Sequence, residues 1–274
     1  MRPSLYKFMA IHKAEYIDWF TSILEGRIYY SSPTSFNDPF EMSSLLAPLD
    51  KSVFATQRRM AGYIPVTPSQ SRAEYGRYLN EFSAKPRPAL SSDWIEGLGV
   101  LCLTTQKDNL LMWAHYAANH SGVCIGFDSG YEPFTDAQPV LYSERRPAVS
   151  SRTPDMELLR GALLTKSPHW SYEKEWRAIK RTISDHEKEY YKGLIARDST
   201  NIDAVATVLS TQGGCGQYEF DPKAIRVICL GARIKRGDAS KIIELTRNHC
   251  PHVRIEEARL DGRYYQINFE RRSR

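Results

Sequence analysis

The chain has 274 residues, and its 42% hydrophobic and 25% charged residues are close to the averages of soluble globular proteins. This composition excludes a wholly disordered chain and a fibrous repeat protein. Lys and Arg number 37 against 32 Asp and Glu, which gives a net charge of +5. So small an excess of positive charge does not by itself indicate a nucleic-acid-binding domain.

The cysteines and the hydropathy of the chain indicate its compartment. There are five cysteines, an odd number, and no C-x-x-C spacing, so neither a disulfide framework nor a four-cysteine zinc site is expected. The first residues lack the apolar stretch of a signal peptide, and no apolar run approaches the roughly 20 residues that cross a bilayer. We therefore predict a cytoplasmic protein with reduced thiols, no membrane association and no metal cofactor.

The N-terminal part of the chain alternates strands with a helix. Residues 5–9 predict an aromatic strand, residues 12–25 carry apolar side chains at helical spacing, and residues 27–31 predict a second strand. Gly26 is a natural end for the helix. The polar segment of residues 43–92, which contains further helix patterns, predicts a helical insertion or lid.

The remaining elements continue this alternation. The predicted strands are residues 98–104, 122–127, 140–142, 225–230, 253–260 and 264–269, with an Asp261-Gly262 hairpin turn between the last two. The predicted helices are residues 108–118, with Asp108 as the N-cap, residues 156–164 and residues 238–248. Together these elements predict a single α+β domain over residues 1–274, with a mixed, mainly antiparallel sheet and flanking helices.

The first polar cluster follows the second predicted strand, at residues 36–41. Asn and Asp side chains bond to nearby backbone, and Pro39 fixes the chain after them, so an Asx-type turn explains the cluster. The alternative is that Asn37 or Asp38 reaches into a ligand pocket.

The second cluster is aromatic and lies in the predicted helix at residues 109–120. It contains Trp113, His115 and Tyr116, and two readings are open: a buried helix with one core histidine, or a pocket floor with convergent polar tips. His115 and His120 are five positions apart, whereas zinc-binding histidine pairs on a helix are four apart. A metal site is therefore not predicted here.

The third cluster, residues 169–177, combines two carboxylates with an arginine. In a strand, Glu173, Glu175 and Arg177 share one face, and neighbouring charges there perturb one another's pKa values. One carboxylate then accepts a sugar hydroxyl and the other acts as a base. In a helix, Glu173 and Arg177 form an ordinary ion pair four residues apart, worth about 0.2–0.5 kcal/mol.

Taken in order, these clusters resemble the bacterial domain of unknown function 2971 family. The matching motifs are LYKF at residues 5–8, GRIYYSSP at residues 26–33, FNDPFE at residues 36–41, MWAHY at residues 112–116, HSGVCIGF at residues 120–127 and WSYEKEWR at residues 170–177. The family name carries no activity, so this resemblance implies common ancestry and no chemistry.

The order of the motifs is also similar to ADP-ribosyltransferase folds. Residues 31–35 resemble the Ser-Thr-Ser-like strand of those enzymes, and Glu173-Lys174-Glu175 resembles their Glu-x-Glu. The first strand departs from the pattern, because Lys7 stands where that fold has Arg or His.

This second resemblance implies an NAD-dependent glycosyl transfer. It implies that Tyr29 or Tyr30 stacks on the nicotinamide and that Lys7 contacts a ribose or phosphate. Glu175 would stabilise positive charge developing at the anomeric carbon, and Glu173 would orient or deprotonate the acceptor. The other cofactor-binding candidates, all polar or aromatic, are Asn37, Asp38, Trp113, His115 and Tyr116.

Three classes of function follow from these readings. The first is an NAD-using transferase or glycohydrolase with a protein or nucleic-acid acceptor, in a toxin or phage-defence context. The second is a non-catalytic module that binds a small nucleotide or a nucleic acid in a bacterial defence system. The third is a structural or interaction protein whose aromatic motifs are core packing.

Overall fold

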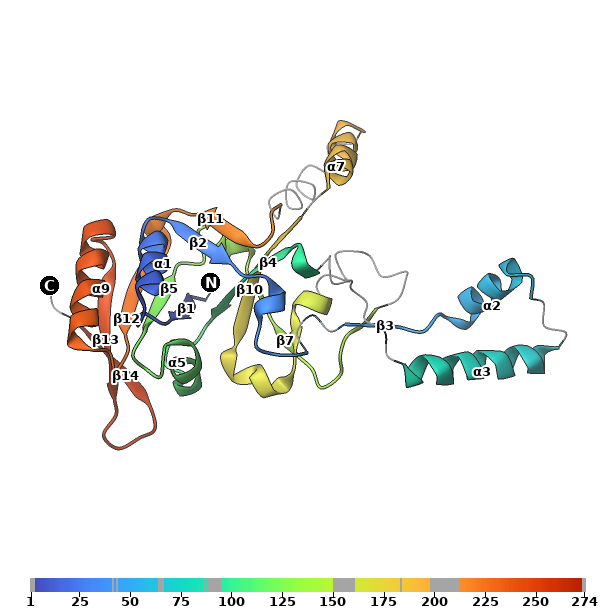
Figure 1. The fold of residues 1–274 in the computed structure, drawn as a ribbon, viewed down its shortest axis with the longest axis horizontal. Coiled ribbons are helices and arrows are strands. Elements are labelled where there is room, and N and C mark those ends of the chain that lie inside the picture. The colour runs from blue at the N-terminus through green and yellow to red at the C-terminus, as the bar shows by residue number, and fades with distance from the viewer. Residues whose placement is uncertain are drawn as a thin grey trace. The chain divides into compact units, whose positions relative to one another are not determined.

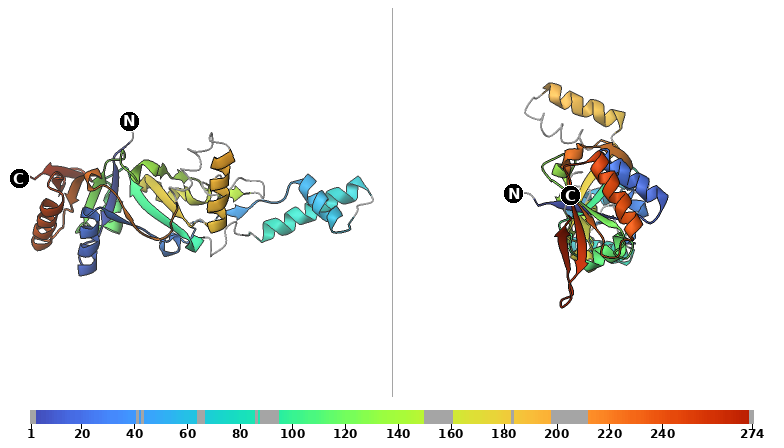
Figure 2. Two further views of the ribbon diagram at one scale, coloured as in Figure 1. Left: turned by 90° about the horizontal axis from the view of Figure 1, so that it is seen from above. Right: turned by 90° about the vertical axis from the view of Figure 1, so that its left-hand side faces the viewer.

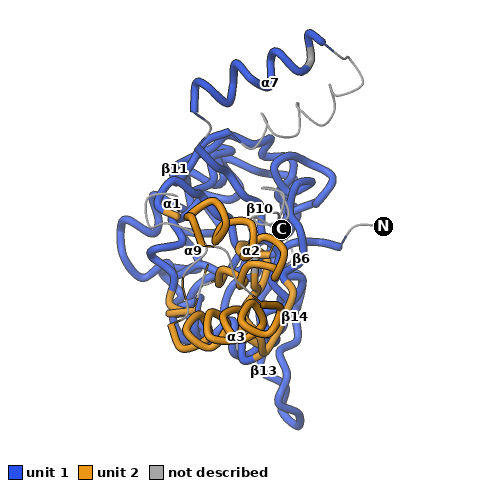
Figure 3. Tube along the Cα trace, turned by 90° about the vertical axis from the view of Figure 1, so that its right-hand side faces the viewer, with its two compact units in different colours: residues 1–36, 96–140, 169–274 blue, residues 37–95, 141–168 orange. Residues whose placement is uncertain are grey.

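The structure is a computed structural model that describes residues 3–40, 42, 44–63, 67–85, 87, 95–149, 161–182, 184–197 and 212–272. The chain is divided into two compact units (Figure 3). The first unit contains Met1–Phe36, Glu96–Val140 and His169–Arg274, and the second contains Asn37–Ile95 and Leu141–Pro168. The sequence predicts one domain with an insertion at residues 43–92; the second unit combines that segment with residues far along the chain.

A sheet of eight strands, counted over the described residues, forms the centre of the first unit (Figure 1). Its order is β14-β13-β12-β5-β1-β4-β10-β6. The strands are β1 (Leu5–Met9), β4 (Leu98–Thr104), β5 (Val123–Phe127), β6 (Gln138–Pro139), β10 (Glu175–Arg181), β12 (Ile225–Leu230), β13 (Arg254–Leu260) and β14 (Ile267–Arg271). Neighbouring strands run antiparallel except β12 and β13, which run parallel. The predicted α+β class with a mixed, mainly antiparallel sheet is thus confirmed.

Helices cover both faces of this sheet (Figures 1 and 2). The helices α1 (Ala14–Leu24) and α9 (Arg236–His249) contribute Phe20 and Ile242, neither of them exposed, to the larger of two hydrophobic cores. The short helix α5 (Leu110–Tyr116) contributes Trp113 to the smaller core, where Phe8 of β1 packs against its ring at 5.1 Å. Alternate residues of β1 therefore serve two cores, because side chains of a strand point to opposite faces.

A separate two-stranded ribbon joins the start of the chain to residues near its end. It pairs β2 (Arg27–Tyr30) with β11 (Gly216–Glu219) in antiparallel register. Gly26 precedes β2 with a φ of +84°, and a Cβ at this position would lie 2.5 Å from the Phe220 carbonyl oxygen. Glycine is thus needed here both as the end of α1 and for the close approach of the two strands.

A left-handed turn follows α5 and leads into β5. Ala118, Asn119 and His120 have φ values of 47°, 55° and 70°, a region that residues with a Cβ adopt at some energetic cost. The turn is closed by the Gly122 amide, which donates to the Ala117 carbonyl at 2.8 Å.

Several boundaries differ from the sequence prediction for local reasons. Asn109, not Asp108, caps α5, because its Oδ1 accepts from the Leu111 and Met112 amides at 2.9 and 3.1 Å. The strand predicted from residue 264 begins at Ile267, since the carboxylate of Asp261 accepts the Arg263 and Tyr264 amides and extends the turn. These bonds also lower the pKa of Asp261 to about 2.

The helix α7 (Asp185–Arg197) is not predicted by the sequence, and one expected helix lies largely outside the described part of the chain. Helix α7 follows β10, and the Ser184 amide and hydroxyl both bond to Glu187 at its start. The helix expected at residues 156–164 falls mostly on residues 150–160, which the structure does not describe.

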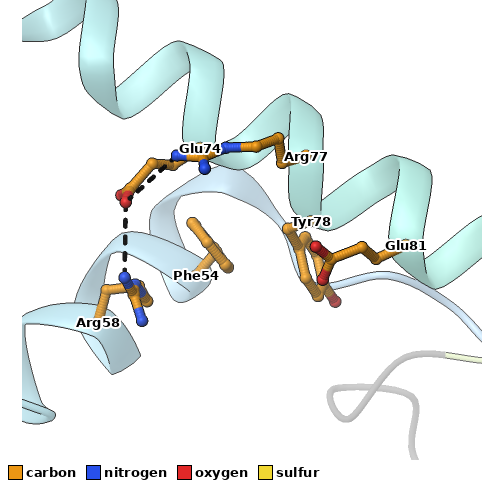
Figure 4. Close-up of a pocket in the computed structure, with 6 residues that line it drawn as sticks. All are labelled: Phe54, Arg58, Glu74, Arg77, Tyr78 and Glu81. Atoms are coloured by element: carbon orange, nitrogen blue, oxygen red, sulfur yellow. Dashed lines mark hydrogen bonds and ion pairs between the residues drawn. The ribbon is translucent and has the colours of Figure 1, made fainter.

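The second unit contains a helical hairpin within residues 43–92, made of α2 (Lys51–Met60) and α3 (Pro68–Ala84). Phe54 of α2 stacks on Tyr78 of α3 with ring centroids 4.7 Å apart (Figure 4). Thr67 and Gln70 form a reciprocal capping box at the start of α3. The expectation that this segment moves as a lid stays a prediction.

Short strand pairs complete the second unit. They are β3 (Leu45–Leu46) with β8 (Ala148–Val149), and β7 (Leu141–Tyr142) with β9 (Thr165–Lys166), both parallel. Among the described residues of the whole chain, the helices are all too short or too polar to span a membrane.

Candidate functional site

A buried ion pair lies at the start of β10. The Arg177 guanidinium donates to Glu175 through Nε at 2.8 Å and through Nη2 at 3.0 Å. The Arg177 side chain is 0% exposed and that of Glu175 is 5% exposed. A bidentate pair of this kind is geometrically specific, but two buried charges are weak contributors to stability because both lose hydration. Such a pair therefore invites a functional explanation.

Two further titratable groups share the environment of this pair. Cys102 of β4 lies directly opposite Arg177 in the strand register, and burial, followed by the Glu175 carboxylate, raises the pKa of its thiol. Lys7 of β1 is partly buried; burial lowers the pKa of its ammonium group, while Cys102 and Glu175 act in the opposite direction. We call Lys7, Cys102, Glu175 and Arg177 the charged centre.

The pairing of β1 with β4 is shorter than its pairing with β5. β1 pairs with β5 at five positions, whereas its pairing with β4 is through Tyr6 and Thr104. Further along β4, Val100 instead forms a bridge with Ser31. The sheet thus loosens between β1 and β4, next to Lys7.

Glu173 lies two positions before Glu175 in the chain but in different local structure. It ends a 3-10 helix, Pro168–Glu173, and the intervening Lys174 has a φ of +44°. The strand prediction is therefore correct for Glu175 and Arg177 and wrong for Glu173, because the chain turns at Lys174. The helix alternative is wrong, since β10 begins at Glu175.

Tyr116 connects α5 to Glu173. Its hydroxyl donates to Glu173 Oε1 at 2.7 Å, and Glu173 is 3% exposed. The hydroxyl of Thr104 also bonds to the Glu173 carbonyl oxygen. The second and third sequence clusters, although 57 positions apart, thus meet at one carboxylate.

Asn109 fixes the relative position of these two clusters. Besides capping α5, its Nδ2 donates to the Tyr172 carbonyl at 2.8 Å. One side chain therefore satisfies two amides of the helix start and holds the segment that precedes Glu173. We consider Asn109 a positioning residue for the site.

A row of aromatic rings borders Glu173. His115 is exposed and lies 6.4 Å from Tyr172, ring centroid to centroid, and Tyr172 lies 6.2 Å from Trp170. Flat apolar faces with polar edges suit the binding of a heterocyclic ring. Through Tyr116, whose ring lies 6.2 Å from that of His115 and whose hydroxyl bonds to Glu173, the row is connected to a buried carboxylate.

Three aromatic candidates lie elsewhere in the first unit. Trp113 is 0% exposed and its Nε1 donates to the Lys107 carbonyl at 2.7 Å, so it is a core residue. Tyr30 is also 0% exposed, and burial raises the pKa of its hydroxyl. Both rings are thus packed in the core of the structure, and their assignment as binding residues stays a prediction. Tyr29 is 51% exposed and its hydroxyl lies 2.9 Å from the Cys215 sulfur.

Asn37 and Asp38 belong to the second unit. Asp38 is 6% exposed, and its Oδ1 accepts from the Phe40 amide at 2.9 Å, which is the bond of an Asx turn. Asn37 is exposed. The turn explanation therefore accounts for the buried carboxylate at this position.

Cys102, Asn109 and Tyr172 are parts of the site that the sequence does not predict. Cys102 and Thr104 alternate in an otherwise apolar strand, LGVLCLT, and this period-2 polar pattern is a signal that could have revealed a polar patch on one face. Asn109 gave no comparable signal, because a cap residue next to Asp108 reads as local structure only.

The described residues contain no group of three or more His, Cys, Asp or Glu arranged to hold a metal ion. No curated protein and no solved structure matches the chain. A family model described as "Protein of unknown function (DUF2971)" matches residues 112–178, a span that includes Tyr116, Glu173, Glu175 and Arg177. Over these residues the chain is similar to the DUF2971 family, in agreement with the resemblance of its sequence motifs.

Proposed function

We propose that the charged centre binds NAD as a co-substrate and transfers its ADP-ribosyl group to an acceptor. The observation that carries the proposal is the buried, bidentate ion pair of Glu175 with Arg177. Close to this pair, the pKa of the Cys102 thiol is raised and that of the Lys7 ammonium group is lowered. Perturbed titratable groups with specific charge partners cluster at functional sites more often than elsewhere.

The chemistry of the side chains supports NAD as the substrate class. The Lys7 ammonium group offers a positive charge for a phosphate, and the two glutamates offer acceptors for ribose hydroxyls. The row formed by His115, Tyr172 and Trp170 offers stacking surfaces for a heterocycle in place of Tyr30, whose ring is buried. The donor set thus fits each part of a dinucleotide.

The proposed reaction breaks the bond between the ribose anomeric carbon and the nicotinamide nitrogen. The bonding electron pair leaves with nicotinamide, and the acceptor nucleophile forms the new bond to the anomeric carbon. Glu175, fixed by Arg177 through two hydrogen bonds, stabilises the positive charge that develops at that carbon. Glu173, oriented by Tyr116, takes the proton that the acceptor loses. With water as the acceptor, the same steps give NAD hydrolysis.

We place this activity in the cytoplasm, in a toxin or phage-defence role. The five cysteines are free in the structure, which suits a reducing compartment, and NAD consumption would be harmful to a host cell. Growth arrest on expression of the wild-type chain, relieved by Glu175→Gln, is the expected cellular result.

The decisive experiment measures nicotinamide release and transfer of label from NAD labelled in its adenylate half. The acceptors are protein, RNA, DNA and water, each supplied separately. Glu175→Gln keeps the shape of the side chain but removes its charge, so we expect the rate to fall by about 10²–10³-fold, the loss typical of a lost electrostatic contact to the reacting group. Circular dichroism verifies that the variant is folded.

The matched control is Glu219→Gln, which makes the same change on β11 at an exposed position, and we expect it to retain full turnover. Full turnover by folded Glu175→Gln would remove Glu175 from the mechanism. Absence of both NAD binding by calorimetry and nicotinamide release in the wild type would overturn the proposal as a whole.

A further inference from the structure

A second candidate site lies at the other edge of the sheet, around the end of α9. It is a groove of about 430 Å³, which we call the basic groove. Its lining residues are Arg247, Cys250, Pro251, His252, Val253, Arg254, Ile255, Arg271 and Arg272. Three strands, β12, β5 and β1, separate β13 from β4; at about 4.8 Å per strand the groove is roughly 20 Å from the charged centre.

The charges of the basic groove are not balanced within the part of the chain that the structure describes. Four arginines line it and no acidic residue does. Arg272 forms an ion pair with Glu257, but no described carboxylate lies within 4.0 Å of the guanidinium groups of Arg247, Arg254 or Arg271. Glu256, which faces Arg271 across the strand pair, bonds instead to Lys107.

Unpaired guanidinium groups that converge on a hollow are complementary to phosphate. The planar fork of arginine donates two parallel hydrogen bonds to phosphate oxygens, which a lysine cannot do. The three arginines come from a helix end, the start of β13 and the end of β14, so they are spread over more than one side of the groove. Such a spread suits consecutive phosphates of a chain better than one isolated anion.

Two exposed tyrosines project from the same pair of strands. Tyr264 and Tyr265, 69% and 101% exposed, lie at the tip of the β13–β14 hairpin, which extends from the sheet as the red loop of Figure 1. The Asp261 carboxylate holds this tip through the Tyr264 amide at 2.9 Å and the Asn268 side chain at 2.9 Å. The rings are thus displayed on an ordered turn, as stacking platforms for unpaired bases are.

We propose that the basic groove and the hairpin tip bind single-stranded nucleic acid, with phosphates in the groove and bases on the tyrosines. The β13 strand of seven residues separates groove and tip by about 20 Å at roughly 3.3 Å per residue. A strand of several nucleotides spans this distance, whereas a mononucleotide does not. The inference is independent of the NAD reaction, because it uses none of the residues of the charged centre.

The test is fluorescence anisotropy of the full chain with labelled 15-nucleotide single-stranded RNA and DNA, over a series of salt concentrations. In Arg254→Gln/Arg271→Gln, two phosphate contacts are removed, so the slope of log K against log salt becomes shallower by about 1.4 and the affinity at 0.1 M salt falls about 25-fold. In Tyr264→Ala/Tyr265→Ala we expect a loss of about fivefold or more for single strands and none for a duplex.

The control is Arg236→Gln, which removes one positive charge at the opposite, exposed end of α9 and should leave both affinity and slope unchanged. The proposal fails if the double arginine variant, shown to be folded by circular dichroism, binds as tightly as the wild type. Full displacement of the labelled strand by equimolar AMP would show that the ligand of the groove is a mononucleotide and would contradict the proposal. Stronger binding to phosphatidylserine vesicles than to RNA or DNA would show that the groove binds a membrane surface and would likewise contradict the proposal.

Discussion

Lys7 lies partly buried on a central strand, where loss of hydration and nearby charges shift the pKa of its ammonium group in opposite directions. Burial lowers the pKa of its ammonium group from 10.5, and the nearby Glu175 and Cys102 restore only part of the loss. A lysine kept in such surroundings reduces the stability of the folded state at neutral pH, since the unfolded chain hydrates it fully. We attribute its presence to ligand binding.

Replacing Lys7 by Met should therefore separate stability from activity. At pH 7 the ammonium group is charged in both states and its desolvation disfavours the folded one, so Lys7→Met should be at least as stable as the wild type. As the pH rises from the lowered pKa to 10.5, the folded wild type releases its proton before the unfolded chain does, and wild-type stability gains on the variant.

Urea unfolding from pH 7 to pH 10 measures this difference. A variant less stable than the wild type at pH 7, or a wild type that gains no stability on the variant between pH 7 and pH 10, would contradict the assignment. Loss of NAD turnover together with unchanged or higher stability would fit a lysine retained for its ligand.

The elements that were predicted well are those whose pattern is complete within a short stretch. β4 and β12 are continuous apolar runs between turn residues, and both have the expected bounds. The sequence does not predict the secondary structure around Glu173, because its residues fit a helix and a strand equally. The change from 3-10 helix to strand depends on the positive φ of Lys174. Local patterns carry no signal for such a backbone choice.

Strand pairing between distant residues and the burial of aromatic rings are also not predictable from local sequence patterns. Nothing in residues 27–30 indicates that they pair with residues 216–219, on the far side of the sequence. Trp and Tyr have an apolar body and a polar tip, so they fit a core and a pocket alike. In the structure Trp113 and Tyr30 are buried in the core, whereas the hydroxyl of Tyr116 donates to Glu173.

The left-handed turn after α5 allows a test with opposite outcomes at neighbouring alanines. Ala118 has a φ of 47°, a conformation that is strained for a residue with a Cβ, so Ala118→Gly should raise the free energy of unfolding by about 0.5–1 kcal/mol. Ala114 lies inside α5, so Ala114→Gly should lower it by about 1 kcal/mol. Urea titration followed by tryptophan fluorescence compares the two; a shift of the same sign for both would contradict the strain argument.

At the scale of the whole molecule, the five free thiols differ sharply in environment. Cys124, Cys229 and Cys250 are buried, and burial raises the pKa of each thiol, for Cys229 to about 12. Cys102 is half-buried, with its pKa raised by burial and by Glu175. Cys215 is exposed, and thiolate access governs reactivity.

A disulfide reagent should therefore modify about one thiol per folded chain rapidly and all five after denaturation. The Cys215→Ser variant should lose the fast phase and keep the slow one. Two or more fast equivalents in the native wild type would show that the interior is more open than the structure indicates. Absorbance of the released chromophore measures both phases.

The central place of β1 in the sheet has a consequence for how the protein is made. β1 is hydrogen-bonded between β4 and β5, which end at residues 104 and 127. At synthesis rates of about 5–20 residues per second, residues 5–9 wait roughly 6–24 s on the ribosome before their second neighbour has been translated. During that interval at least one edge of the strand is unpaired, so we expect folding of the nascent chain to depend on chaperone contact at residues 5–9.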